Sequence, residues 1–178
     1  MRTHVALIRG INVGKAKRVA MADLRAELEA LGYAHVATLL NSGNVAFTVP
    51  KGAKGDPAER IAAVLEKRLG VSARVTVLAT AELDTALAAN PHAKVAKDPS
   101  KLLVTVLASA AEAKRLAPFA KQDWKPEAFA VAGRCAYLWC PNGVLESRAW
   151  KAVERELADG ATSRNWATMT KLLALARG

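Results

Sequence analysis

The residues best suited to chemistry come directly after the first apolar run of the chain. Val5–Ile8 ends at Arg9, and a loop with two glycines and three more cations follows. Arginine carries a rigid fork of donors that matches phosphate or carboxylate, and glycine lets the backbone approach a ligand closely. The spacing is neither that of a P-loop nor that of a dinucleotide fingerprint. The predicted anion cradle comprises Arg9, Gly10, Asn12, Gly14, Lys15, Lys17 and Arg18.

A purely structural interpretation of this loop stays open, in which Arg9 pairs with a carboxylate and Asn12 closes a turn. Ser42 and Asn44, which flank Gly43 at a predicted hairpin tip, have two interpretations as well. Turn residues of these types ordinarily bond the local backbone, and this interpretation is favoured. To bind a ligand, they would have to lie close to the loop after the first strand. This is possible because the first and third strands of the predicted sheet are antiparallel neighbours, so the third strand starts beside the end of the first.

Arg164 and Asn165 precede the last predicted helix, within the segment Thr162–Thr168. Asn165 or Thr162 would satisfy the free N–H groups at the start of that helix. An unpaired arginine is costly to bury. We therefore expect Arg164 either to pair with a carboxylate across a domain interface or to join Arg9 in one basic pocket between domains.

The elements that would hold these residues are visible as apolar periodicities. Short runs rich in β-formers predict strands, and stripes at i, i+3, i+4 and i+7 predict helices. In the first half, strands are predicted at 4–9, 36–40, 45–49 and 74–78, and helices at 21–31 and 57–69. The order β-α-β-β-α-β is that of the ferredoxin-like plait, a four-stranded antiparallel sheet with both helices on one face.

The second half repeats this pattern without its last strand. Its strands are predicted at 102–107, 128–132 and 135–140, and its helices at 110–116 and 147–158. A short helix predicted at 80–89 precedes it and ends the first half. In place of a fourth strand, the pattern predicts only a helix that starts near Trp166. A polar connector at 92–101 indicates the boundary. The predicted fold class is α+β, with a ferredoxin-like domain at 1–90 and a second one at 91–178 that carries an added C-terminal helix.

The net charge of +10 invites nucleic acid as a partner, but its distribution does not favour that. Residues 1–50, 51–100, 101–150 and 151–178 carry +3, +2, +3 and +2, so no block is basic by itself. Tyr137 and Trp139 share one strand face, as base-stacking aromatics of RNA-recognition domains do, although packing between domains is the favoured interpretation. No apolar run approaches the ~20 residues that span a bilayer. We expect a cytoplasmic protein without a membrane partner.

No catalytic or metal-binding constellation emerges from the histidines and cysteines. Cys135 and Cys140 are five residues apart on one predicted strand, so they would point to opposite faces and could not pair. The two cysteines and three histidines lack the spacing of a zinc site. We expect no metal and no cofactor, and whether the protein is an enzyme stays open, as does its oligomeric state.

Three motifs resemble those of a known family. They are Ala6–Gly14 with Met21, Leu24 and Gly32; Ser42–Val45; and Thr162–Thr168 with Lys171 and Leu172. Tyr137, Pro141–Gly143 and Ser147 match the segment in between. The chain is similar, over residues 4–173, to a bacterial family known as domain of unknown function 1697 (DUF 1697). The resemblance implies two ferredoxin-like plaits and no assigned activity. Lys15, where the family often has glycine, and His92, where an aromatic is usual, depart from its pattern.

The leading functional hypothesis is a module that binds an anionic or phosphorylated small molecule between its domains, with Arg9, Asn12 and Arg164 as anchors. If a reaction is catalysed there, arginine or lysine would stabilise developing negative charge. One alternative is an RNA- or DNA-binding module, and another is a protein-interaction scaffold that uses the C-terminal helix.

Overall fold

The computed structural model describes residues 1–15 and 17–178, apart from the side chain of Asp159. These residues divide into two compact units: unit 1 is Met1–Asp84 with Lys171–Gly178, and unit 2 is Thr85–Thr170. The chain passes between the units inside two helices, α3 (Thr80–Ala88) and α6 (Trp166–Arg177). The second half of α6 therefore belongs with unit 1, whereas the sequence pattern assigned the whole helix to the second domain.

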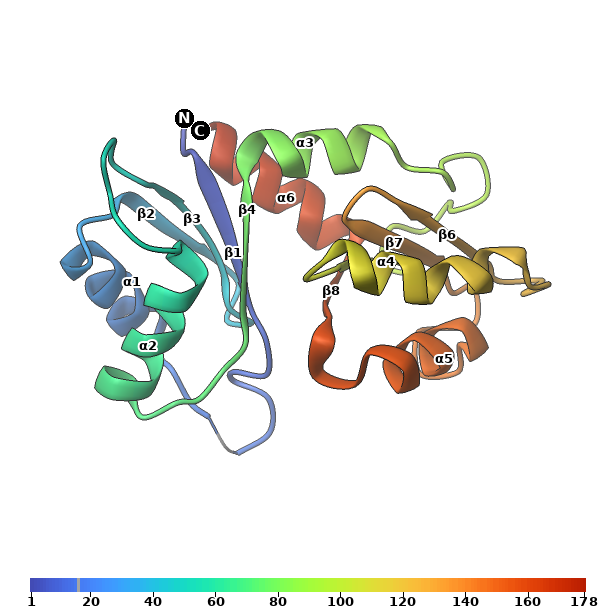
Figure 1. The fold of residues 1–178 in the computed structure, drawn as a ribbon, viewed down its shortest axis with the longest axis horizontal. Helices are drawn as coiled ribbons and strands as arrows, with labels where there is room; N and C mark the ends of the chain where they lie inside the picture. The colour runs from blue at the N-terminus through green and yellow to red at the C-terminus, as the bar shows by residue number, and fades with distance from the viewer. Residues whose placement is uncertain (16) are drawn as a thin grey trace. The chain divides into compact units, whose positions relative to one another are not determined.

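Unit 1 contains a four-stranded antiparallel sheet in the order β2-β3-β1-β4 (Figure 1). Its strands are β1 (His4–Ile8), β2 (Ala34–Leu39), β3 (Asn44–Thr48) and β4 (Val75–Ala79). Its helices α1 (Met21–Ala30) and α2 (Pro57–Leu69) alternate with them along the chain. Because β1 is central, its end lies between the start of β3 and the start of β4.

The bounds of α2 follow from residues with clear local preferences. The Asp56 carboxylate accepts hydrogen bonds from the backbone N–H groups of Ala58 (2.6 Å) and Glu59 (3.2 Å), which satisfies two free donors of the first turn. Pro57 occupies the first helical position, where its missing N–H costs nothing. Gly70 ends the helix with a left-handed φ of 66°. The sequence prediction for this helix is confirmed at both ends.

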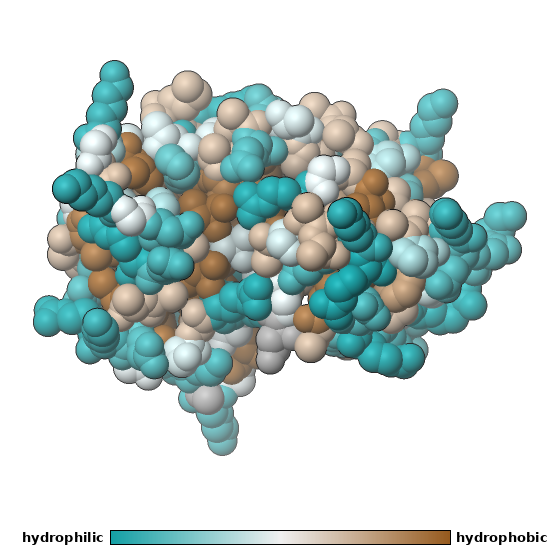
Figure 2. Space-filling model, in the orientation of Figure 1, coloured by the Kyte–Doolittle hydropathy of each residue, from teal (hydrophilic) through white to brown (hydrophobic). Residues whose placement is uncertain are grey.

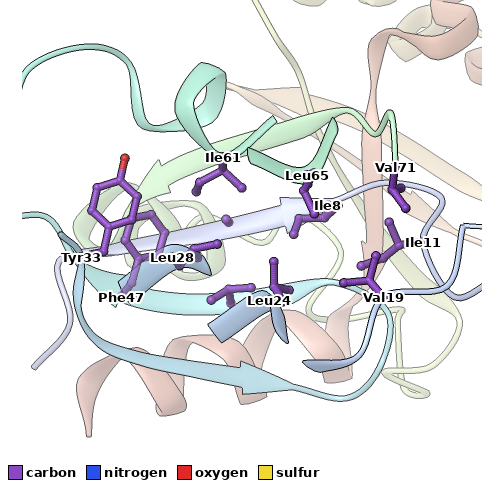
Figure 3. Close-up of a cluster of buried hydrophobic side chains, with 12 residues drawn as sticks. Ile8, Ile11, Val19, Leu24, Leu28, Tyr33, Phe47, Ile61, Leu65 and Val71 are labelled. Carbon is purple, nitrogen blue, oxygen red and sulfur yellow. The ribbon is translucent and has the colours of Figure 1, made fainter. Parts of the chain in front are cut away.

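The core of unit 1 lies between the sheet and its two helices (Figure 3). Alternate residues of the strands point to the same side, so Ile8 and Phe47 meet Leu24 of α1 and Leu65 of α2. Fully burying one such side chain contributes about 1.5–3 kcal/mol. Alternation also places Leu7 on the other face of β1, and it is equally buried, as expected for a covered central strand.

The last turn of α6 is bonded to the start of the chain. The backbone N–H of Arg2 donates to the carbonyl of Ala176 (2.7 Å), and the Arg2 guanidinium donates to the carbonyl of Leu175 (2.5 Å). The guanidinium of Arg177 pairs with the carboxylate of Asp84 at 2.6 Å. These bonds explain why Lys171–Gly178 is part of unit 1.

Unit 2 repeats the strand order of unit 1, as β6-β7-β5-β8 with all neighbours antiparallel. Its strands are β5 (Leu102–Val106), β6 (Ala128–Ala132), β7 (Cys135–Trp139) and β8 (Thr162–Asn165). Its helices are α4 (Ala110–Leu116) and α5 (Arg148–Leu157), followed by 3₁₀ turns at Ala117–Lys121 and Ala158–Gly160. A buried cluster that includes Leu107, Leu138 and Val153 fills the space between the sheet and these helices.

Strand β8 corrects the sequence prediction, which had no fourth strand in the second half. Thr162 pairs with Val106, and Asn165 pairs with Leu103, so the segment extends the sheet beyond β5. The hydroxyls of Thr105 and Ser163 are hydrogen-bonded at 2.7 Å. Four polar residues carry no apolar alternation, so the pattern did not reveal the strand, and its backbone pairing with β5 supplies the stability instead.

Glu127, just before β6, reaches the start of α5. Its carboxylate accepts hydrogen bonds from the Ser147 hydroxyl (2.6 Å) and from the backbone N–H groups of Arg148 (2.9 Å) and Ala149 (3.0 Å). Burial raises the pKa of this carboxyl, but the hydrogen bonds and the charge of Arg148 outweigh burial, so the pKa lies below its ordinary value. The carboxylate thus complements the positive end of the α5 dipole.

Candidate anion-binding site

Three loops of unit 1 meet where β1 ends. The backbone N–H of Ile8 donates to the carbonyl of Gly43 at the tip of the β2–β3 hairpin (2.8 Å). The N–H of the next residue, Arg9, donates to the carbonyl of Arg74, just before β4 (2.8 Å). The loop after β1 is therefore flanked on one side by the hairpin tip and on the other by the segment that leads into β4.

Asn12 holds the loop after β1 in one conformation. Its side-chain oxygen accepts from the N–H of Val19 (2.9 Å), and its amide nitrogen donates to the carbonyl of Val19 (2.8 Å) and to that of Asn41 (2.8 Å). Its own N–H donates to the carbonyl of Lys17 (3.0 Å). Both side-chain N–H groups are thus used within the protein, so Asn12 shapes the loop rather than offering these donors to a ligand.

Gly43 allows the hairpin tip to approach this loop. A Cβ at this position would lie 2.8 Å from the Cβ and the carbonyl oxygen of Ile8 and 3.0 Å from Cδ1 of Ile11. Its φ of 79° is also left-handed, so glycine is required on both counts. The contact between hairpin and loop, left open by the sequence, is present.

Ser42 and Asn44 serve the hairpin itself. The side-chain nitrogen of Asn44 donates to the Ser42 hydroxyl (2.9 Å) and to the carbonyl of Leu39 (3.1 Å). Asn44 is completely buried, whereas Ser42 is exposed. This agrees with the interpretation that both residues bond the local turn, and of the two only Ser42 has a side chain that solvent reaches.

The loop after β1 carries exposed cations on an unusual backbone. Gly10, Asn12, Gly14 and Lys17 all have positive φ, between 53° and 74°. Left-handed residues next to ordinary ones turn successive N–H groups toward one side, a geometry that binds anions. The side chains of Lys15, Lys17 and Arg18 are exposed.

Folding concentrates charge that the sequence spreads out. The three segments that meet here, 9–20, 40–43 and 70–74, contain no aspartate or glutamate. Their five cations amount to half of the net charge of +10, although the segments come from distant parts of the sequence. The cations are Arg9, Lys15, Lys17, Arg18 and Arg74.

Arg164 and Asn165 lie in unit 2, on β8. Burial lowers the pKa of Arg164 to about 10, and its guanidinium donates to the carbonyl of Ser163 (2.8 Å). The side-chain oxygen of Asn165 accepts from the N–H of Thr168 (2.8 Å). Asn165 therefore caps the start of α6, as predicted.

The other candidates from the sequence have structural partners. Tyr137 is fully buried and its hydroxyl donates to the carbonyl of Ala86 (2.7 Å), so its ring is not available to stack on a base. His92 is buried too, with its Nε2 3.2 Å from the carbonyl oxygen of Tyr137, and burial lowers its pKa. Cys135 and Cys140 are buried and are not joined in a disulfide.

The described residues contain neither a metal-binding cluster nor a membrane-spanning helix. No cluster of three or more His, Cys, Asp or Glu side chains in residues 1–15 and 17–178 is placed to hold a metal ion. In the same part of the chain, every helix is too short or too polar to cross a membrane.

A pocket of about 370 Å³ lies at the start of β1, at the opposite end of this strand from the loop after β1. Its walls include Arg2, Thr80 and the ion pair of Asp84 with Arg177. None of the predicted site residues lines it.

The segments 9–20, 40–43 and 70–74 together form the basic end of unit 1. Sequence reasoning did not identify Arg74 and Asn41 as parts of it. Arg74 stood only as the first residue of a predicted strand. A usable signal was the predicted strand order, because in a β-α-β-β-α-β sheet β4 starts beside the end of β1.

The chain is thus an α+β protein with two four-stranded antiparallel sheets and six α-helices in its described residues. The family described as a protein of unknown function (DUF1697) matches residues 1–137, and the chain belongs to this family, as its motifs predicted. A solved structure of a conserved bacterial protein from Streptococcus pneumoniae is similar, with a TM-score of 0.81 and 22% identity. The similarity covers 100% of this chain and 99% of that one, and it supports the fold alone. No curated protein matches the chain.

Proposed function

We propose that unit 1 binds an anionic ligand of the phosphate class at the loop between β1 and α1. The observation that supports this most is the combination, in one loop, of exposed cations with left-handed backbone fixed by Asn12. A loop already held in its binding conformation loses little entropy when the ligand arrives.

The charge balance supports an anion rather than a cation or a neutral ligand. A ligand beside Lys15, Lys17 and Arg18 meets no carboxylate from the three converging segments. The start of α1 also contributes, but less. Ala20 at the N-cap makes no side-chain hydrogen bond to the first turn, so the positive end of the helix dipole is not capped there. Asp23 in that turn already offsets part of the helix dipole, so the side-chain cations carry most of the attraction.

Arg164, in unit 2, is proposed separately as a contact for an anionic group. Its partly buried guanidinium is suited to a carboxylate or phosphate oxygen. An Arg164→Lys variant keeps the charge and loses the fork of donors. Weaker ligand binding in this variant, with unchanged stability, would support a ligand contact.

We also infer that each unit is a ferredoxin-like plait. The strand order β2-β3-β1-β4, the antiparallel pairing and the β-α-β-β-α-β sequence of elements support this for unit 1, and β6-β7-β5-β8 does so for unit 2. Two buried thiols that form no disulfide fit a reducing compartment, which supports our expectation of a cytoplasmic protein.

The test of anion binding is a thermal-shift series with inorganic pyrophosphate, nucleotides and short RNAs. At 100 times the dissociation constant, a ligand stabilises the folded state by about 2.7 kcal/mol. For a chain of this size, that corresponds to roughly 5–10 °C. The triple variant Lys15→Gln, Lys17→Gln, Arg18→Gln should lose this shift.

The matched control removes three exposed cations elsewhere: Lys51→Gln, Lys54→Gln, Lys94→Gln. It lowers the net charge equally and should keep most of the shift. Equal losses in the two triple variants would mean that binding follows net charge alone, and the loop would not be the site. A shift that only RNA produces, and that falls steeply with salt, would favour the nucleic-acid alternative.

A further inference from the structure

Two aliphatic side chains are exposed at the basic end of unit 1. Val13, in the loop after β1, is 70% exposed, and Leu40, at the hairpin tip, is 57% exposed. Their chain neighbours Asn12 and Asn41 are joined by a hydrogen bond of 2.8 Å. Consecutive Cα atoms are about 3.8 Å apart, so the two aliphatic residues lie on adjacent loop tips.

The exposure of Leu40 is imposed by the backbone around it. Leu40 has a φ of 59°, a left-handed conformation that is unfavourable for a leucine. The carbonyl of Leu39 before it accepts from Asn44, and the carbonyl of Asn41 after it accepts from Asn12. Because the backbone is fixed on both sides, the leucine stays on the solvent side of the hairpin. An exposed leucine adds little hydrophobic stabilisation to the isolated protein.

The two aliphatic tips share their surroundings with the cations of the proposed anion site. Lys15, Lys17 and Arg18 follow Val13 in the same loop, and the segments 9–20, 40–43 and 70–74 contain neither an acidic nor an aromatic residue. Figure 2 shows hydrophilic side chains projecting from this loop at the lower edge of the view.

We propose that this end of unit 1 docks on an anionic lipid surface. Val13 and Leu40 enter the headgroup region, and the surrounding lysines and arginines contact lipid phosphates. Apolar insertion together with attraction to anionic lipids is how peripheral proteins bind membranes reversibly. The inference rests on the proposed function, since the lipid phosphate is the anion, and it adds the source of that anion.

The observations favour lipid over nucleic acid at this surface. Proteins that hold single-stranded nucleic acid stack its bases on aromatic rings, and these loops have none. The sequence expectation of no membrane partner considered a spanning segment, which peripheral docking does not need.

The test is sedimentation of the full chain with vesicles of pure phosphatidylcholine or with 30% phosphatidylserine, at about 0.1 M salt. The variant Val13→Thr, Leu40→Asn removes both aliphatic tips while keeping the shape of valine and a residue that tolerates positive φ. The matched control is Val95→Thr, Leu145→Asn, at two aliphatic residues of unit 2 that are 52% and 81% exposed.

We expect binding to the phosphatidylserine vesicles only, about tenfold weaker in Val13→Thr, Leu40→Asn and unchanged in the control. The pyrophosphate thermal shift of both variants should equal that of the wild type. Lack of binding to anionic vesicles, or equal binding by both variants, overturns the lipid proposal and leaves anion binding standing. Loss of the pyrophosphate shift in the lysine and arginine triple variant alone tests the proposed function separately. Tighter binding of RNA than of vesicles, with the same loss in Val13→Thr, Leu40→Asn, would overturn the choice of lipid.

Discussion

Replacing Asn12 tests whether one side chain holds the basic loop. Asn12→Ala removes hydrogen bonds to the N–H and carbonyl of Val19 and to the carbonyl of Asn41. Each contributes about 0.5–1.5 kcal/mol net, and partial exposure places these bonds in the lower half of that range. Alanine at a φ of 55° adds about 1 kcal/mol of backbone strain. We expect Asn12→Ala to lower the free energy of unfolding by about 3 kcal/mol.

Two further variants divide this effect. Asn12→Gly loses the same hydrogen bonds but tolerates the positive φ, so it should cost about 1 kcal/mol less than Asn12→Ala. Asn41→Ala is the control, because Asn41 contributes its backbone carbonyl to Asn12 and keeps it when the side chain is shortened. It should change stability by less than about 0.5 kcal/mol.

Urea unfolding followed by far-UV circular dichroism and by tryptophan fluorescence gives the measurement. The four tryptophans, Trp124, Trp139, Trp150 and Trp166, all lie in unit 2, so fluorescence reports that unit and circular dichroism reports both. Asn12 lies in unit 1, so its effect is read from the circular dichroism transition. With a slope of about 2 kcal/mol per M urea, Asn12→Ala should lower the urea midpoint of that transition by more than 1 M. A shift below about 0.25 M, or an equal shift in Asn41→Ala, would refute the assigned role of Asn12.

Three other variants test the packing and electrostatics described above. Gly43→Ala should destabilise by more than 2 kcal/mol in the same urea assay, whereas Gly52→Ala should cost only about 1 kcal/mol, because both glycines have left-handed φ but only Gly43 meets atoms within 3.0 Å. Glu127→Gln should cost about 2 kcal/mol at pH 7. Because the pKa of Glu127 is depressed in the folded state, that difference should fade as the pH drops below the ordinary value of 4.5, and a constant difference would contradict it. Tyr137→Phe leaves the carbonyl of Ala86 without its donor and should cost about 1–2 kcal/mol by thermal unfolding, so an unchanged melting temperature would argue against that bond.

Local chemistry explains which parts of the fold were predictable. Asp56, Pro57 and Gly70 each have a strong preference for one position of a helix, so α2 could be placed to the residue. Ser109 caps α4 by accepting from the N–H of Glu112, although the carboxylate of Glu112 bonds the N–H of Ala108 rather than that of Ser109. Where one residue decides the outcome, sequence patterns suffice.

Features that depend on distant partners were less accessible. Strand β8 forms because the backbone of Thr162–Asn165 meets an open edge of β5, and its side chains carry no sign of that edge. The sequence indicated Asn12 as a residue of the anion cradle or of a turn. It did not reveal that the side-chain amide of Asn12 donates to the carbonyl of Asn41, 29 residues away. The even charge of the sequence likewise concealed the basic end of unit 1, since the concentration arises only when three loops converge.

The division of the chain has a consequence for its synthesis. Unit 1 is built from Met1–Asp84 and Lys171–Gly178, with the 86 residues of unit 2 between them. A ribosome that adds about 5–20 residues per second needs roughly 4–17 s to make unit 2 after the first part of unit 1 has emerged. During that interval the carbonyl partners of Arg2 on α6 do not yet exist. The half that begins to fold first is therefore the half that is completed last, and a nascent chain exposes the surface of unit 1 meant for α6 until translation has passed Gly178.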